Sequence, residues 1–269
     1  MQHITRRRFL ETSACAAALG AGTPRLSAAT KVEKGFTGLF DGKTLKGWHK
    51  NPQRIGHGTG GVWRAEDNTI TGEQDPPGSG NGGILLTDDH FSDFDLRLDI
   101  RPDWGVCSGL FLRGNDRGQC LQMMVDYHDA GNIGHIYGEG TGGFNTRHFD
   151  IDGNMENGKL VGLKPRTKDQ KPPLGYSISG EKFCSVYKVD DWNSVRVTCV
   201  GKHPRIITWI NGEKICEFNA ATYKGPGFDR DNIAKTLGGK GSIAVQVHGG
   251  GGWPKGAKCR WRNIRIKTL

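Results

Sequence analysis

Apolar and polar side chains alternate in many segments of the chain. The clearest segment is residues 94–101, in which every second residue from Phe94 to Ile100 is apolar and the residues between them are charged. A period of two is typical of a β-strand with one face in the core, because a helix repeats every 3.6 residues. The same reasoning predicts further strands over residues 109–113, 121–128, 195–200, 206–210, 213–218, 243–248 and 259–266.

Turn-forming residues separate these predicted strands. The pair Asn211-Gly212 lies between two apolar runs, which is the strongest short signal for a β-hairpin. Helical windows are few and short, and one of them lies near residues 229–237. Regularly spaced strands and turns with few short helices predict an all-β fold, a two-sheet β-sandwich of the jelly-roll type.

Residues 138–189 break this pattern. They are rich in Gly, Pro and Lys and show little periodicity. Such a long irregular region in a compact domain is usually functional, often as a rim or lid over a site. We therefore expect a long irregular insertion in the sandwich. The chain length of 269 residues suits one domain of this kind.

Glycine is the compositional outlier: it makes up 42 of the 269 residues, about 16%, where the usual share is about 7%. It follows no three-residue period and is accompanied by only 11 prolines, which excludes a collagen. No apolar run reaches the roughly 20 residues of a spanning helix, so no membrane span is predicted. The seven Trp, 11 Phe and five Tyr argue against disorder.

The first 29 residues have the pattern of a twin-arginine export signal. Residues 5–10 read Thr-Arg-Arg-Arg-Phe-Leu, a short apolar run covers residues 14–21, and residues 27–29 form a small-x-small cleavage site. We predict cleavage after Ala29, a single domain over residues 30–269, and a periplasmic or extracellular location. The signal carries four Arg and one Glu, so the net charge of +9 falls to +6 in the remainder. That remainder has no basic run with interleaved aromatic residues, so no nucleic-acid partner is expected.

Six cysteines follow the predicted signal, at positions 107, 120, 184, 199, 216 and 259. An exported protein can hold disulfides, and free buried thiols are the alternative. No Cys-x-x-Cys spacing occurs, which argues against a thiolate zinc site. The Asn211-Gly212 hairpin puts Cys199 and Cys216 two strands apart, roughly 9–10 Å, which is too far for a disulfide.

Three predicted strands place polar side chains on the face opposite their core face. These side chains are Gln246 and His248, then Gln122, Asp126 and His128, then Arg113. If the strands share a sheet, the groups gather on one surface. Arginine offers bidentate donors, histidine exchanges a proton near neutral pH, and a carboxylate beside it can act as a base. The alternative is that these side chains only face water.

Other chemical signatures are absent or open. Asp126, His128 and His135 offer ligands for a divalent metal ion, so a metal cofactor stays an open question. Residues 138–143 match G-x-G-x-x-G, but no helix follows to bind a phosphate. There is no G-x-S-x-G elbow and no paired carboxylate run, which argues against a usual serine hydrolase or a two-carboxylate glycosidase.

Eight motifs, found in order along the chain, resemble one bacterial family. They are LFDGKTLKGW at 39–48, DFDL at 93–96, SGLFLRG at 108–114, IYG at 136–138, DWNSVR at 191–196, WING at 209–212, QVHG at 246–249 and WRNIRI at 261–266. The chain is thereby similar to the 3-keto-disaccharide hydrolase-like family, whose domains are also called 3-keto-alpha-glucoside 1,2-lyase/3-keto-2-hydroxy-glucal hydratase domains. The similarity spans nearly the whole chain after the predicted signal.

The resemblance implies a concanavalin A-like jelly roll that acts on oxidised (3-keto) sugars. A ketone at C3 acidifies the C2 hydrogen, so a base can form an enolate and the C1 substituent can leave by β-elimination. Water then adds to the product, and the net result is hydrolysis. A sugar 3-dehydrogenase is expected upstream. Elimination followed by hydration needs a base, an enolate stabiliser and an acid.

The resemblance and the shared strand face together suggest roles for individual residues. His128 or Asp126 is the expected base, and Arg113 with His248 is expected to stabilise the enolate or the leaving group. Sugar hydroxyls are expected to bind to Gln122, Gln246, Tyr137, Glu139 and His135. Many relatives carry Tyr-Glu-x-Gln where this chain has Leu-Gln-Met-Met at 121–124, and the amide of Gln122 cannot act as a base. The rival functions are a non-catalytic carbohydrate-binding module and a structural domain.

Overall fold

The computed structural model describes residues 33–269. The predicted export signal over residues 1–29 therefore lies outside the described residues. Among the described residues, neither helix is long and apolar enough to cross a membrane.

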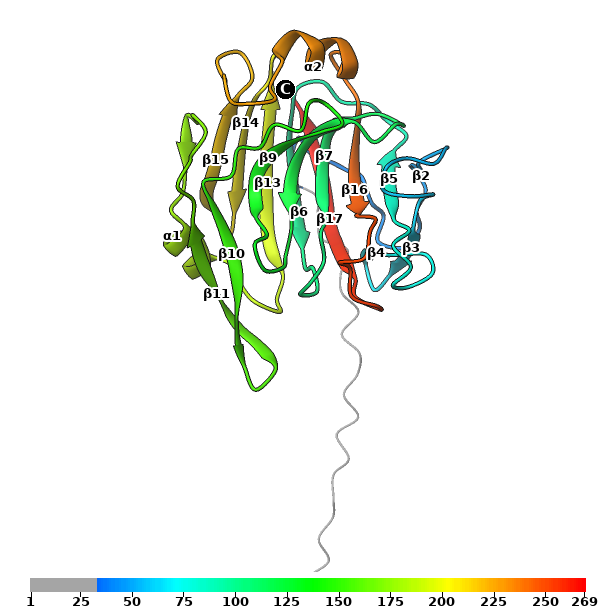
Figure 1. The fold of residues 1–269 in the computed structure, drawn as a ribbon. Coiled ribbons are helices and arrows are strands. Elements are labelled where there is room, and N and C mark those ends of the chain that lie inside the picture. Colours follow the sequence, from blue (N-terminus) through cyan, green and yellow to red (C-terminus); the bar gives the residue numbers. More distant parts are fainter. Residues whose placement is uncertain (1–32) are drawn as a thin grey trace, which may run out of the picture. The chain divides into compact units, whose positions relative to one another are not determined.

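Two antiparallel β-sheets make up most of the described chain (Figure 1). In spatial order the first sheet contains β12 (Tyr176–Ser177), β15 (Glu213–Asn219), β14 (Arg205–Ile210), β13 (Asn193–Val200), β6 (Phe94–Ile100), β17 (Cys259–Thr268), β4 (Thr69–Glu73) and β3 (Val62–Glu66), with β1 (Thr37–Gly38) beside β17. The second sheet contains β2 (Trp48–Lys50), β5 (Gly83–Thr87), β16 (Ser242–Val247), β7 (Gly109–Gly114), β8 (Cys120–Val125) and β9 (Ile133–Glu139). The nine-stranded and six-stranded sheets form the β-sandwich that the sequence predicts.

The hydrophobic core lies between the sheets and follows the period-two pattern. Phe94, Leu96 and Leu98 of β6 are buried in the same cluster as Leu110 of β7 and Val245 of β16. Each of these side chains is at most 1% exposed. All eight strands predicted from alternation are present, with bounds that differ by a few residues. The six-stranded sheet consequently has a second face that points away from this core.

Local turn and cap chemistry agrees with the sequence. Asn211 and Gly212 both have positive φ (51° and 87°) and join β14 to β15, as a two-residue hairpin turn requires. The helix α2 (Arg230–Leu237) begins after Asp229, whose side chain accepts hydrogen bonds from the backbone N–H groups of Asp231 and Asn232.

The six cysteines of the described chain are free thiols. Cys199 pairs with Ile206 across to β14, whereas Cys216 pairs with Thr208 from the other side of that strand. Cys199 and Cys216 therefore lie two strands apart, which confirms the prediction that they do not form a disulfide.

The insertion over residues 138–189 is more regular than its sequence suggests. It contains a hairpin of β10 (Phe149–Glu156) and β11 (Lys159–Thr167), followed by α1 (Gly180–Val186). Most of its residues are half-buried or exposed on both faces, so no apolar alternation marks the strands. In Figure 1 this hairpin extends beyond the edge of the two sheets.

The base of this hairpin is fixed to the loop that follows β8. The Ala130 N–H donates to Asp152 Oδ1 and the Gly153 N–H donates to Asp129 Oδ1, both at 2.9 Å. Gly131 and Ile151 also form a β-bridge. The insertion therefore holds the loop that carries His128.

Candidate functional site

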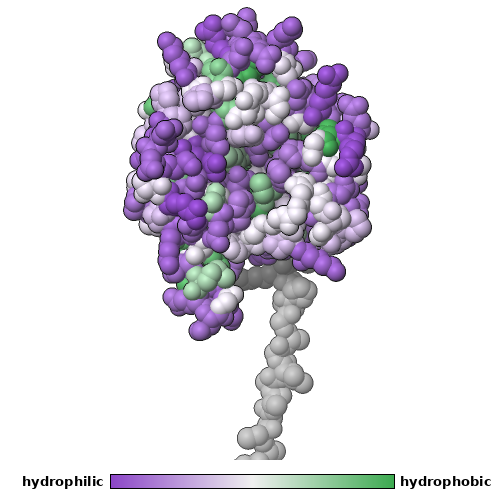
Figure 2. Space-filling model, in the orientation of Figure 1, coloured by the Kyte–Doolittle hydropathy of each residue, from purple (hydrophilic) through white to green (hydrophobic). Residues whose placement is uncertain are grey.

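The outer face of the six-stranded sheet carries a buried polar pair. Phe111, Gln122 and Tyr137 lie opposite one another on β7, β8 and β9. Gln122 Nε2 donates to Gln246 Oε1 at 3.0 Å and to the Ser108 carbonyl at 3.3 Å. Both glutamines are buried, and the sequence correctly predicts that they share a face. Polar residues cover most of this side of the molecule (Figure 2).

His57 completes this polar pair and was not found from the sequence. It lies between β2 and β3 and is only 7% exposed. The Gln246 amide is 3.0 Å from His57 Nε2, and Glu139 Oε1 is 3.5 Å from the same nitrogen. The ring centroids of His57 and His248 are 4.8 Å apart. Two imidazoles, two amides and a carboxylate thus occupy one surface.

The strand register brings three more side chains into one row at the edge of this surface. Gly109 pairs with Met124, and the Val106–Tyr127 bridge continues this register, so Cys107 just before β7 lies opposite Asp126 just after β8. The backbone N–H of His248 donates to the Cys107 carbonyl at 3.2 Å, which continues the row onto the end of β16. Cys107 was not among the residues predicted from the sequence. The register of the hairpin formed by β7 and β8 is the signal that could have identified it.

Cys107 and Asp126 share a hydrogen bond. The Cys107 thiol donates to Asp126 Oδ1 at 3.2 Å. Burial raises the pKa of the Cys107 thiol, and the charge of Asp126 raises it further. Burial also raises the pKa of Asp126, although the thiol hydrogen bond opposes that shift. Cys107 is therefore a protonated donor, which makes it a poor nucleophile.

His128 and His248 each form a hydrogen bond to a backbone carbonyl through the same ring nitrogen. His128 Nδ1 is 2.8 Å from the Asp129 carbonyl, and His248 Nδ1 is hydrogen-bonded to the Gly249 carbonyl. A carbonyl oxygen only accepts, so in both rings Nδ1 carries the proton. When the ring is neutral, Nε2 has a free lone pair that can accept a proton or bind a metal.

A pocket of about 340 Å³ opens at this row of residues. Its wall contains Trp104, Cys107, His128, His248 and Trp253, together with Gly105, Asp129, Gly249 and Gly252. Trp104 is half-buried and Trp253 is buried. The pocket therefore combines titratable groups with aromatic surfaces, an arrangement that suits a small polar ligand.

Two residues that the sequence places on this surface lie elsewhere. Arg113 is 2% exposed, and its guanidinium donates to Asp93 Oδ1 and the Ser92 carbonyl, both at 2.8 Å. Its positive φ of 53° and a bulge between β7 and β16 break the alternation that was assumed there. Burial raises the pKa values of Asp126 and Tyr137, and the charge of Arg147, which pairs with Asp150 at 3.2 Å, partly opposes that rise, so this cation lies near the surface instead.

His135 is the second residue outside the site. Its side chain is fully buried, with Nδ1 3.2 Å from Asn132 Oδ1 and Nε2 2.9 Å from Ser177 Oγ. Burial lowers the pKa of His135 to about 3. A bulge between β8 and β9 turns this residue away from the face that Tyr137 and Glu139 share. His135 therefore reaches neither the pocket nor the side chains of Asp126 and His128.

Comparison with known proteins gives both a family and a fold. The model of the 3-keto-alpha-glucoside-1,2-lyase-like domain matches residues 35–267. The chain is 23% identical over 267 residues to a 3-keto-disaccharide hydrolase of Bacteroides thetaiotaomicron, an alignment that covers 87% of this chain and 79% of that protein. A candidate glycosyl hydrolase of Parabacteroides distasonis has the same fold, with a TM-score of 0.50 and 21% identity over 87% of this chain and 99% of that one.

Proposed function

The chain belongs to the family of 3-keto-alpha-glucoside-1,2-lyase-like domains, and we propose that it cleaves 3-keto-glycosides at the pocket beside His128 and His248. A base removes the C2 proton to give an enolate, and the C1–O bond then breaks with protonation of the leaving oxygen. Water adds across the C1–C2 double bond of the 3-keto-2-hydroxy-glucal, which completes a net hydrolysis. The observation that carries this proposal is the Nε2 lone pair of His248 at the wall of this pocket.

We assign the base to His248. Its Nδ1–H is held by the Gly249 carbonyl, so its Nε2 is available to the C2 proton. His57, 4.8 Å away between ring centroids, is the group that returns a proton to the leaving oxygen. Glu139, whose Oε1 is 3.5 Å from His57 Nε2, is the carboxylate that faces this imidazole. His128 and Asp126, the bases suggested by the sequence, are the alternatives to His248.

The sugar hydroxyls and the enolate need other groups. Tyr137 is half-buried on this sheet face and can hold a hydroxyl, and the buried amides of Gln122 and Gln246 support the face from below by bonding to each other. Arg147, the cation near Asp126 and Tyr137, is our candidate for stabilising the developing enolate, the role expected of Arg113 from sequence alone. An amide at position 122 suits this scheme, because the base is an imidazole.

Hydrogen exchange separates the two proton transfers. A 3-keto-disaccharide is incubated with enzyme in D2O, and deuterium at C2 is followed by NMR, with the equally acidic C4 position as an internal reference. His248→Gln should lose enzymatic C2 exchange together with cleavage. His57→Gln should keep C2 exchange and lose cleavage. His90→Gln, which changes an exposed histidine, should match the wild type.

The outcomes of this assay are distinct. If His248→Gln exchanges C2 as the wild type does, His248 is not the base, and His128 and Asp126 become the candidates. If wild-type enzyme neither exchanges C2 nor cleaves any 3-keto-glycoside, the proposed reaction is wrong. Binding without product formation would instead support a carbohydrate-binding module, for which the half-buried Trp104 offers a stacking surface.

The cellular context completes the proposal. We propose that residues 1–29 direct export by the twin-arginine route, so that the enzyme works in the periplasm or outside the cell. Cell fractionation with Arg6 and Arg7 both changed to Lys tests this, because the precursor should then stay in the cytoplasm. The substrate ketone must come from an oxidation at sugar C3, which is the work of an upstream dehydrogenase.

A further inference from the structure

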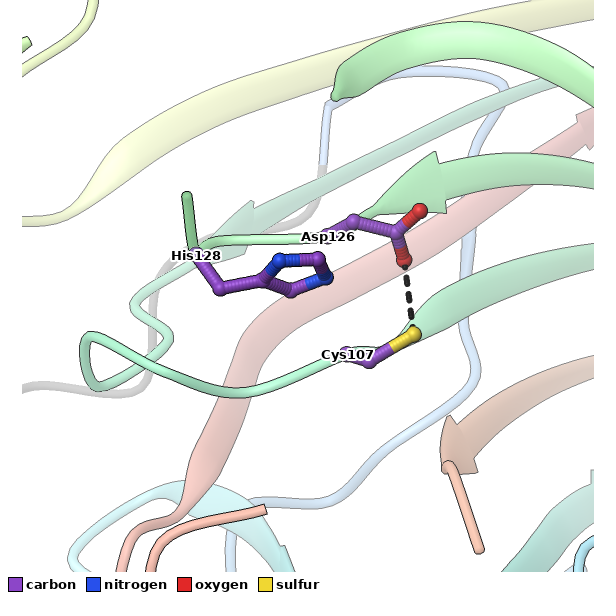
Figure 3. A group of neighbouring side chains, drawn as sticks. All are labelled: Cys107, Asp126 and His128. Atoms are coloured by element: carbon purple, nitrogen blue, oxygen red, sulfur yellow. Dashed lines mark hydrogen bonds between the residues drawn. The ribbon is translucent and has the colours of Figure 1, made fainter. Parts of the chain in front are cut away.

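The Cys107–Asp126–His128 cluster has the ligand set of a transition-metal site. One ligand atom from each residue lies within 4.8 Å of the other two (Figure 3). In a tetrahedral site with bonds of about 2.0–2.3 Å, ligand atoms are roughly 3.3–3.8 Å apart. Cys107 Sγ and Asp126 Oδ1 are already 3.2 Å apart. Small side-chain movements are therefore enough to enclose one ion.

His128 is oriented as a metal ligand usually is. Its Nδ1–H donates to the Asp129 carbonyl at 2.8 Å, which leaves Nε2 as the lone-pair donor. Metal-binding histidines typically give their second ring N–H to a carbonyl or carboxylate, which fixes the ring. Figure 3 shows the His128 ring turned toward the other two side chains. This orientation is an observation independent of the clustering.

The loop that carries His128 is itself held in place. The carboxylate of Asp129 accepts a hydrogen bond from the Gly153 N–H, and Asp152 accepts one from the Ala130 N–H. Asp152 also forms a two-point ion pair with Arg166 of the neighbouring strand. The β10–β11 hairpin therefore fixes the backbone directly after His128, the third ligand, as a preorganised metal site requires.

We propose that Cys107, Asp126 and His128 bind one divalent transition-metal ion of the zinc type, with an open coordination position toward the pocket. A thiolate, an imidazole and a carboxylate suit zinc, cobalt or iron(II), whereas magnesium and calcium prefer oxygen ligands. Three protein ligands with a free fourth position are typical of a catalytic site. Binding displaces the proton that Cys107 donates to Asp126, and this proton goes to solvent.

The pocket gives the ion a chemical role, which rests on the proposed function. Cys107 and His128 both line the 340 Å³ pocket, so its ligand would meet the open position directly. An ion there would polarise the C3 carbonyl and stabilise the enolate as a Lewis acid. His248 lies on the same pocket wall and stays free to take the C2 proton.

Cobalt spectroscopy tests the site without any substrate. The purified protein is cleared of metal with a chelator and titrated with Co²⁺. One equivalent should produce a near-ultraviolet thiolate-to-cobalt charge-transfer band together with strong tetrahedral visible bands. Zn²⁺ should abolish both by displacement. Cys107→Ser should lose the charge-transfer band and weaken binding at least 100-fold, and Asp126→Asn should weaken it at least tenfold.

Cys184→Ser is the matched control, because it removes another partly exposed thiol and should leave the cobalt spectrum unchanged. Circular dichroism of each variant checks that it folds. The absence of a charge-transfer band in the wild type, or its persistence in folded Cys107→Ser, would overturn the metal site. A wild-type band in a protein that does not act on 3-keto-glycosides would leave the metal site standing and refute the proposed function.

Discussion

Replacing His135 with glutamine should make the folded state less sensitive to acid. The imidazole is fully buried, with Asn132 as the acceptor for its Nδ1–H and the Ser177 hydroxyl at its Nε2. Burial is the main cause that lowers its pKa to about 3, and the charges of His148 and Arg147 contribute. The unfolded chain binds a proton at this residue below pH 6.5, whereas the folded chain does not until far lower pH.

The size of the effect follows from proton linkage. The free energy of unfolding that depends on His135 is fully present above pH 6.5 and is lost as the pH falls toward 3. Each pH unit in that window costs about 1.36 kcal/mol, so at pH 4.5 the wild type loses about 2.7 kcal/mol through this residue. That figure depends little on the folded pKa, because pH 4.5 is well above it.

Denaturant unfolding at pH 7.5 and pH 4.5 measures this contribution. Glutamine keeps a neutral hydrogen-bonding group but does not titrate, so the wild type should lose about 2.7 kcal/mol more than His135→Gln between the two pH values. His90→Gln, at an exposed position, should behave as the wild type does. The reasoning is refuted if the wild type and His135→Gln lose the same free energy.

Three further substitutions test other parts of the structure. Gly109→Ala would put Cβ 2.0 Å from the Gln122 amide, so we expect this amide to move. The value of kcat/KM on a 3-keto-disaccharide should then fall at least tenfold, which corresponds to about 1.4 kcal/mol. Unchanged kinetics would remove Gln122 from the site. Arg113→Met should lower the free energy of unfolding by about 1–3 kcal/mol through loss of the Asp93 pair, with turnover within twofold of the wild type; a stable but inactive variant would return Arg113 to the catalytic site. Gly212→Ala has a free Cβ position but a φ of 87°, so thermal melting should reveal about 1–2 kcal/mol of strain, and no change would argue against the hairpin turn.

Alternation predicts β6 to β8 and β13 to β17 because it is a local signal, whereas β4 and β5, which are buried on both faces, show no alternation and were not predicted. Residues 94–101 read as a strand with no knowledge of its neighbours. The order of the strands within each sheet cannot be predicted in this way. For example, β6 pairs with β13 and β17, which lie about 100 and 160 residues further along the chain. No local pattern specifies such partners. The β10–β11 hairpin was also missed, because its two faces are too evenly polar to show a period.

The candidate site could be predicted only where strand register determines it. Gln122 and Gln246 project from regular strands, so counting by two places them on one face. Arg113 follows the same count, but its positive φ ends the alternation one residue before the strand does. His57 comes from a loop nearly 190 residues before Gln246, and only the tertiary fold brings the two together.

Glycine explains how these distant segments come close enough to form one site. A Cβ on Gly249 would lie 2.4 Å from the His57 carbonyl oxygen, and one on Gly82 would lie 2.1 Å from the Val247 carbonyl oxygen. A side chain at either position would move the backbone by about 1 Å, a displacement that can cost a catalytic group about 100-fold in rate. The rings of His57 and His248 therefore depend on the direct approach of two backbones. In the sequence, the high glycine content indicates only turns and loops. In the structure, Gly82 and Gly249 let the backbones approach closely enough to place the proposed acid and base.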